Sequence, residues 1–155
     1  MTQLMDGSFR YAMADRPWHS FEEGSDDLMK VLHVDEELGQ VVFVQRFGRD
    51  TTHMRHTHHC TAVAYTLSGC WEYDGDKFPT GVVAFEPPGS THTAMTRDGN
   101  VADVLVVLTS QQNNGRLLEL HLEDGTSAEL DIGIFQMMMT TSPAEFLSAM
   151  AEREK

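Results

Sequence analysis

Residues 48–92 read GRDTTHMRHTHHCTAVAYTLSGCWEYDGDKFPTGVVAFEPPGSTH, and this stretch decides the fold. Its apolar runs are short and are separated by turn residues, a pattern typical of β-strands. Asp74-Gly75 is a strong signal for a tight hairpin turn. Pro87-Pro88-Gly89 ends another apolar run and turns the chain back before His92. The stretch therefore predicts consecutive strands that return toward His56 and His58.

Similar short runs lie on both sides of this stretch, and they extend the prediction to most of the chain. We expect strands at residues 28–34, 40–47, 56–67, 70–73, 82–85, 101–109, 117–122 and 127–132. Strands at such regular spacing with Gly-rich turns are typical of a sandwich or barrel. Only the C-terminus predicts a helix, where Ser142-Pro143-Ala144-Glu145 supplies an N-cap, a proline at the first helical position and a capping-box glutamate. The three methionines at 137–139 are expected to fill the core.

Length and composition fit one globular domain. The chain has 155 residues, of which 41% are hydrophobic and 23% charged. We divide it into an N-terminal arm at 1–24, a barrel at 25–140 and a C-terminal helix at 141–155.

Charge and cysteine content narrow the function classes. The formal net charge is -13 and no Lys/Arg cluster is present, so neither nucleic acid nor a membrane surface is an expected partner. The N-terminus has neither the basic patch nor the apolar core of a secretory signal, which predicts a cytoplasmic protein. Cys60 and Cys70 are then expected to be reduced thiols.

The histidines provide the main functional signal. Four of the eight histidines of the chain, including His53 and His59, lie between residues 53 and 59. In a strand His56 and His58 point to the same face, with Cα atoms roughly 6–7 Å apart, so both imidazoles can reach one ion. Neutral imidazole suits iron, copper, nickel and zinc rather than magnesium or calcium. A His-x-His pair alone fits a surface strand equally well, and the downstream return of His92 favours the metal site.

These residues carry a family resemblance. The first sequence motif of the cupins is similar to the arrangement here of Gly48, His53 and His56-x-His58 through Gly69. Gly81-x5-Pro87-x-Gly89-x2-His92 resembles the second motif at every anchoring position. The resemblance implies an all-β, single-domain cupin (a double-stranded β-helix or jelly-roll barrel). It also implies that His56, His58 and His92 are metal ligands.

The sequence departs from the cupin pattern at two places. Many cupins have a glutamate ligand four or five residues after the second histidine, where this chain has Ala62 and Val63. Thr96 stands where the second motif ends in asparagine. Three neutral ligands would leave the full +2 charge on the ion and open positions for substrate and O2, which favours a catalytic over a structural metal.

A narrower resemblance indicates a reaction class. The segment from His56 through Tyr65-Thr66-Leu67 to Trp71 is similar to 2,4'-dihydroxyacetophenone dioxygenase-like proteins, and the three-histidine pattern is similar to that of acetylacetone-cleaving dioxygenases. The resemblance implies an Fe(II)-dependent dioxygenase that cleaves a carbon–carbon bond of a small diketone or hydroxyketone, with O2 as co-substrate. Zinc, nickel or manganese could replace iron, and a homodimer is expected. A non-enzymatic metal or ligand sensor and a metal-dependent isomerase or hydrolase are the alternatives.

Other residues are assigned to the pocket or set aside. Cys60, Ala62, Glu72 and Phe85 are candidates to line it. For Cys60 a buried inert thiol is the favoured interpretation, and for Glu72 an exposed turn carboxylate is just as plausible. Trp71, Tyr73 and Phe85 are expected to supply apolar wall or core. His53 and His59 are expected to stand off the metal, at its mouth or on the opposite face.

Overall fold

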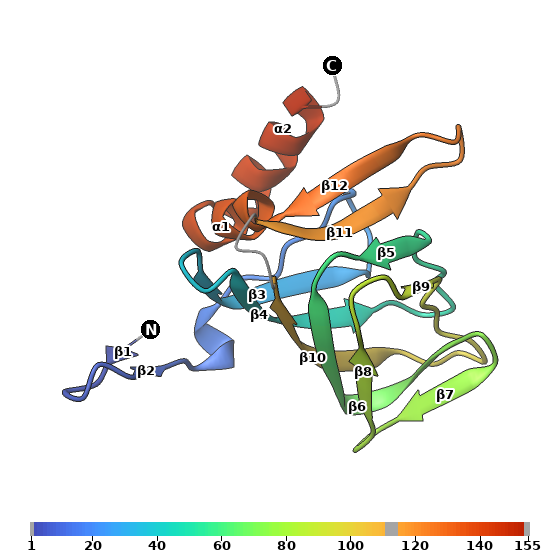
Figure 1. The fold of residues 1–155 in the computed structure, drawn as a ribbon, viewed down its shortest axis with the longest axis horizontal. Coiled ribbons are helices and arrows are strands. Elements are labelled where there is room, and N and C mark those ends of the chain that lie inside the picture. Colours follow the sequence, from blue (N-terminus) through green and yellow to red (C-terminus); the bar gives the residue numbers. More distant parts are fainter. Residues whose placement is uncertain (1, 111–114, 154–155) are drawn as a thin grey trace.

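Two antiparallel sheets enclose the core of the protein (Figure 1). The computed structural model describes residues 2–110 and 115–153. The larger sheet contains β3 (Leu28–Asp35), β4 (Gln40–Phe47), β10 (Ala102–Thr109), β6 (Thr61–Tyr73) and β7 (Asp76–Pro79) in that order, with β8 (Val83–Glu86) paired to β6. The smaller sheet contains β12 (Ser127–Asp131), β11 (Arg116–His121), β5 (His56–His58) and β9 (Thr91–His92) in that order. The all-β prediction is confirmed.

The chain changes sheet between His58 and Thr61. We expected a single strand at 56–67, but β5 belongs to the smaller sheet and β6 to the larger. We expected a break at Ser68-Gly69, but the strand β6 continues through Gly69 to Tyr73. Gly69 has a φ of 77° and the pairing of β6 with β10 shifts beside it, so the break in the pattern is an irregularity within one long strand.

Both predicted hairpins are present. Asp74 and Gly75 have φ values of 52° and 87° and join β6 to β7, as a two-residue turn with two positive φ angles requires. Asp124-Gly125 lies between β11 and β12, which pair as an antiparallel hairpin.

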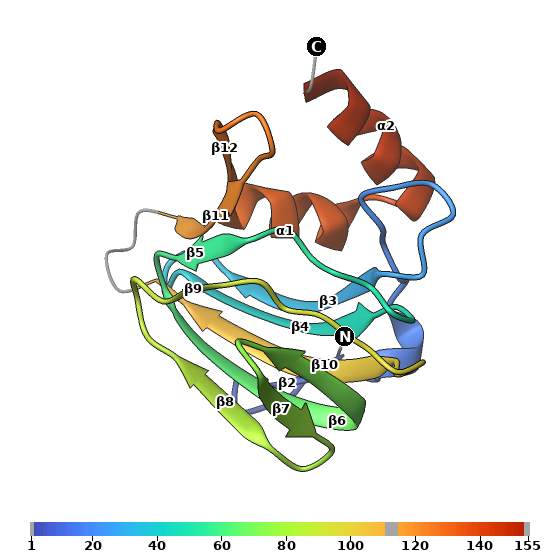
Figure 2. The ribbon, with the colours of Figure 1, turned by 90° about the vertical axis from the view of Figure 1, so that its right-hand side faces the viewer.

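Two helices close one side of the core (Figure 2). The predicted helix is α2 (Pro143–Arg153), and its capping box is confirmed: the Ser142 amide donates to Glu145 at 2.8 Å and the Glu145 amide to the Ser142 hydroxyl at 3.3 Å. An unexpected helix, α1 (Ile132–Thr140), precedes it, because Asp131 ends β12 and accepts a hydrogen bond from the Ile134 amide as an N-cap. Its buried residues join the core between the sheets.

The N-terminal segment lies on the outer face of β3 and β4. It contains the small hairpin β1 (Thr2–Gln3) and β2 (Phe9–Arg10) and a 3-10 turn at Met13–Asp15. The Trp18 ring lies 4.5 Å from Lys30 Nζ and 4.5 Å from the Arg46 guanidinium carbon, and the Tyr11 hydroxyl hydrogen-bonds His33. Among the described residues, no helix is long and apolar enough to cross a membrane.

Candidate metal centre

Strand pairing brings three histidines together. His92 on β9 lies directly opposite His56 on β5, and His58 shares the face of His56. The ring centroids are 4.6 Å apart for His56 and His92, 5.0 Å for His56 and His58, and 5.1 Å for His58 and His92. One nitrogen from each ring lies within 4.8 Å of the other two. Three imidazole nitrogens this close together could serve as ligands of one ion.

Hydrogen bonding leaves nitrogen lone pairs available at the centre. His56 Nδ1 lies 3.0 Å from the Met54 carbonyl, which can only accept, so Nδ1 carries the proton and Nε2 is free to bind a cation. His58 is 3% exposed, and neither of its ring nitrogens has a hydrogen-bond partner within the described part of the chain. An unpaired buried imidazole nitrogen is costly, and a metal ion at this point would satisfy it.

Burial keeps the three rings neutral. Loss of solvent, and then the proximity of His56 and His92, lowers the pKa of His58 to about 3. Loss of solvent and the nearby His56 likewise lower the pKa of His92 to about 4, and burial lowers the pKa of His56. Because only neutral imidazole binds metal, these shifts suit the residues to ligation at neutral pH.

A carboxylate that the sequence analysis did not assign lies beside the histidines. Glu86 on β8 is 5% exposed, and its two oxygens lie 3.4 Å from His58 Nε2 and 3.4 Å from His92 Nε2. Burial raises the pKa of Glu86 to about 7. The centre therefore has a carboxylate beside its three neutral histidines, and Glu86 provides it rather than a residue at position 62 or 63 or the turn residues Glu72 and Asp74.

The position of Glu86 follows from strand register. Glu86 pairs with Ala62, the residue at the place where a cupin glutamate was missing. The carboxylate thus comes from the neighbouring strand at the same level of the barrel. The sequence held one signal for this residue: a glutamate in an otherwise apolar strand, alternating with buried Ala84.

Tyr73 completes the surroundings of the three histidines. Its ring stacks on His92 with centroids 4.2 Å apart and planes at 5°, and its side chain hydrogen-bonds Glu86. Burial and the charge of Glu86 raise the pKa of Tyr73 to about 12, so the hydroxyl keeps its proton and donates to the carboxylate. The sequence analysis had expected only apolar wall or core from this residue.

The other residues expected to line the pocket differ in their surroundings. Cys60 and Ala62 are fully buried, and burial raises the pKa of the Cys60 thiol to about 12, which makes it unreactive. Glu72 lies 3.8 Å from Lys77 and 3.7 Å from Arg97, so its carboxylate pairs with cations rather than with the histidines. Phe85 is 66% exposed, and its placement in the pocket is wrong because Ala84 and Glu86 take the inward positions of β8.

The neighbouring histidines bind other groups. His53 Nε2 lies 3.2 Å from Asp27, and its ring packs on Phe47 with centroids 4.5 Å apart. His59 Nε2 lies 3.1 Å from Glu119. Arg116 contacts His59 and Glu129, so this second cluster of potential ligands is already an ion-pair network.

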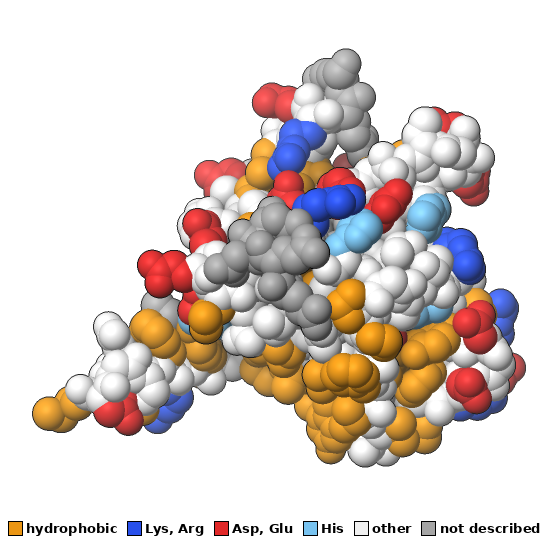
Figure 3. Space-filling view, viewed as in Figure 1, with side chains coloured by type: hydrophobic (Ala, Val, Ile, Leu, Met, Phe, Trp, Pro, Cys, Tyr) orange, Lys and Arg blue, Asp and Glu red, His pale blue; other side chains and the backbone are white. Residues whose placement is uncertain are grey.

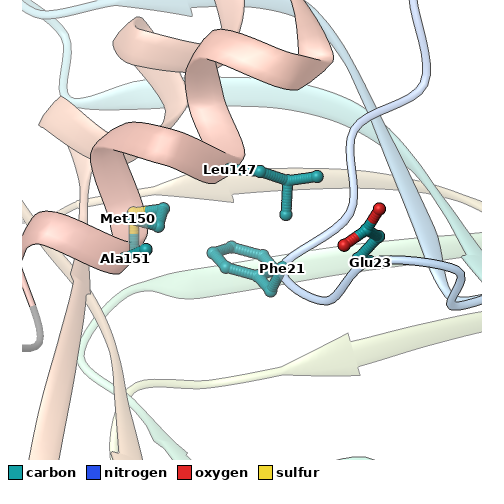
Figure 4. A pocket seen from close by; sticks show the side chains of 5 residues that line it. All are labelled: Phe21, Glu23, Leu147, Met150 and Ala151. Atoms are coloured by element: carbon teal, nitrogen blue, oxygen red, sulfur yellow. The ribbon is translucent and has the colours of Figure 1, made fainter.

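Two surface hollows flank different parts of the molecule. One, of about 560 Å³, adjoins β5 and is lined by Thr52, His53, Met54, Arg55, His121, Leu122 and Glu123. The other, of about 270 Å³, lies between Phe21, Glu23 and helix α2 (Figure 4), and none of its lining residues belongs to β5, β8 or β9. The first hollow is therefore the one next to the candidate metal centre.

Comparison with known proteins gives a family match. A family model described as the ChrR cupin-like domain matches residues 6–111, about two thirds of the chain. A search of curated proteins found no match.

Solved structures share the fold at low sequence identity. A protein of unknown function with a cupin-like fold from Ralstonia eutropha JMP134 is 24% identical, with 92% of this chain and 84% of that chain covered and a TM-score of 0.69. An acetylacetone dioxygenase from Acinetobacter johnsonii is 14% identical, with coverages of 89% and 93% and a TM-score of 0.66. The complex of Rhodobacter sphaeroides SigE with the anti-sigma ChrR matches at 16% identity, with coverages of 63% and 51% and a TM-score of 0.53.

Proposed function

The chain belongs to the family of ChrR cupin-like domains, and from this premise we propose that it is an Fe(II)-dependent dioxygenase. Its substrate would be a small diketone or hydroxyketone that chelates the metal and loses a carbon–carbon bond to O2. His56, His58 and His92 would hold the ion. The single observation that carries the proposal is the meeting of three neutral imidazoles, two of them buried and one half-buried, whose ligand nitrogens all lie within 4.8 Å of one another.

The donor set fits a divalent transition metal. Imidazole nitrogens and a carboxylate suit iron, zinc, nickel and manganese, and the interior position excludes most water. Iron bound here would supply Lewis acidity toward a chelated ketone oxygen and a redox centre for O2.

The side chains around the histidines have separate roles in this proposal. The Met54 carbonyl orients His56, and the stacked Tyr73 ring holds His92 in place. Glu86, whose carboxylate oxygens lie 3.4 Å from His58 and His92, would accept the acidic proton of a β-diketone as the substrate becomes an enolate. The Tyr73 hydroxyl would stabilise the ionised form of Glu86 through its hydrogen bond.

The hollow beside β5 is the proposed route for the substrate. It contains Arg55, the residue immediately before His56, together with His53 and His121. The lining also includes Glu123, so the entrance carries one fixed positive and one fixed negative charge besides the two histidines. Arg55 would be the group that pairs with an enolate or other anionic ligand on its way to the centre.

A metal sensor is the second candidate, and the proximity of Glu86 favours it. If Glu86 completed a four-ligand set with the histidines, the site would be closed and tetrahedral, as in structural zinc sites. One structural neighbour is the anti-sigma ChrR in complex with its partner protein.

Metal analysis and O2 uptake separate the two candidates. The purified protein is stripped of metal, reconstituted anaerobically with Fe(II) or Zn(II), and supplied with acetylacetone or 2,4'-dihydroxyacetophenone. The dioxygenase predicts O2 consumption that requires both Fe(II) and a ketone. Tight zinc binding with no O2 uptake across the panel would support the sensor and contradict the dioxygenase.

A pair of variants tests the metal centre itself. His92→Ala is expected to lower metal affinity at least about 100-fold, because one of three ligands is lost. His59→Ala is the matched control, since His59 lies next to His58 in sequence but contacts Glu119. Metal content by mass spectrometry and folding by circular dichroism are the readouts. Unchanged metal content in a folded His92→Ala protein would show that the ligand assignment is wrong.

A further inference from the structure

The strands β6 and β8 have an inverted pattern of side chains. On β6 the inward residues Ala62, Ala64 and Thr66 are small and at most 4% exposed. The outward residues of the same strand are larger and apolar: Val63 is 37% exposed, Tyr65 40% and Leu67 36%. A sheet that faces water normally has polar residues on its outer face, so this face is unsuited to solvent.

The same inversion continues across neighbouring strands. On β8 the buried position is Glu86, whereas Val83 and Phe85 are 55% and 66% exposed. Strand register places Val63 between Phe85 and Val107, and Tyr65 between Val83 and Leu105. We call this surface the bare face, and it consists of Val63, Tyr65, Leu67, Val83, Phe85, Leu105 and Val107.

The bare face is a continuous patch. Figure 3 shows it as an orange area over β6 and β8. The exposed parts of its side chains amount to roughly 500 Å², near the upper end for the largest apolar patch of a typical monomer. None of its members carries a charge.

The remainder of the same outer face is covered by the chain itself. Trp18 packs between Lys30 and Arg46 over β3 and β4. The bidentate ion pair of Arg46 with Asp103, at 2.7 and 2.8 Å, marks the boundary with the bare face. In the described ranges the N-terminal segment therefore protects one half of the sheet and leaves the other half open.

We propose that the bare face binds the same face of a second copy of this chain, giving a two-fold symmetric dimer. A standard interface needs about 800 Å² from each partner, and homodimer interfaces are about 65% apolar. The bare face would supply roughly 500 Å² of apolar surface, which is about three fifths of that area and close to the apolar share of a homodimer interface. The polar residues around it would have to supply the rest. Two twisted sheets can also pack face to face with their side chains interdigitated.

Charge favours a second copy over other occupants. Each chain carries a net charge of -13, so two copies would repel each other over most surfaces. The bare face lets them meet without placing carboxylates in contact. An anionic membrane would be repelled by a chain with this net charge.

The mass of the protein in solution tests the proposal. Light scattering and sedimentation velocity between about 1 and 100 µM should give twice the 17.4 kDa of one chain. The double variant Tyr65→Glu/Val83→Glu should be folded and monomeric, with a dimer Kd raised at least 100-fold. Leu38→Glu is the matched control, because Leu38 is 62% exposed in the turn between β3 and β4, outside the bare face, and should leave the dimer intact.

Three results would overturn the inference. One is a wild-type protein that stays monomeric at 100 µM, which decides the question even if the double variant does not fold. Another is a folded double variant that remains dimeric. The third is a monomer that uses this face for lipid vesicles or another protein. None of these depends on O2 uptake, so the dimer and the dioxygenase can fail separately.

Discussion

At the scale of single residues, the centre depends on which side chains are buried together. His56, His58 and His92 were identifiable because a His-x-His pair and a turn-linked histidine have a recognisable spacing. Glu86 and Tyr73 were not, because their roles come from contacts with His58 and His92 across strands. Spacing along the chain does not encode those contacts.

The opposite pKa shifts of the histidines and Glu86 predict a pH dependence for metal-free protein. The pKa values of His58 and His92 fall from 6.5 to about 3 and about 4, so below pH 6.5 the unfolded state binds more protons and folding is weakened. The pKa of Glu86 rises from 4.5 to about 7, so the folded state holds this proton more tightly than the unfolded state does. The resulting contribution of Glu86 to the free energy of unfolding is full below pH 4.5 and is lost as pH rises through 7. Between pH 4.5 and 6.5 Glu86 therefore partly offsets the loss from the histidines.

Glu86→Gln should remove this offset. In EDTA, the free energy of unfolding of the variant should fall more steeply than that of the wild type as pH is lowered from 6.5 to 4.5. Urea unfolding at pH 8, 6.5 and 5 would measure it. Parallel curves for the two proteins would mean that Glu86 titrates at its ordinary value.

At the scale of elements, turn residues and alternation were reliable guides. Asp74-Gly75, Asp124-Gly125 and the Ser142–Glu145 box lie where the sequence predicts them. The sheet change after His58 and helix α1 were not predicted, because an apolar run is compatible with a strand, a crossover or a buried helix.

Gly69→Ala should strongly destabilise the protein. Gly69 has a φ of 77°, and a Cβ there would lie 1.8 Å from the Val101 carbonyl oxygen. We expect a loss of about 3 kcal/mol or more in the free energy of unfolding from backbone strain and this clash. Gly81→Ala is the control, with a φ of 88° and no atom within 4 Å of the added Cβ, and should cost about 1–2 kcal/mol. Equal losses in urea unfolding would exclude the clash as the cause.

At the scale of the whole molecule, the candidate centre spans both sheets. His56, His58 and His92 belong to the smaller sheet, and Glu86 belongs to the larger. A bound ion at this position would link β5 to β9 and favour the arrangement of β8 beside them. The two sheets should therefore be held together more firmly with metal than without it.

Metal removal should lower thermal stability. An ion present at about 100 times its Kd stabilises the folded state by about 2.7 kcal/mol, which corresponds to roughly 5–10 °C in Tm for a chain of this size. Differential scanning calorimetry before and after EDTA treatment, and after return of Fe(II) or Zn(II), measures this shift. The His92→Ala protein serves as control and should show no shift with EDTA. A wild-type Tm that is indifferent to metal would argue against binding at this centre.

The sequence by itself determined the all-β class, the turns, the C-terminal helix cap and the three histidines. These features are local, because they depend on side-chain alternation, turn conformation and spacing within a few residues. Only the tertiary structure decided that Glu86 faces the histidines, that Tyr73 stacks on His92, and that Phe85 points outward. Each of these depends on the register between strands distant in sequence, where a shift of one residue would exchange the inner and outer faces.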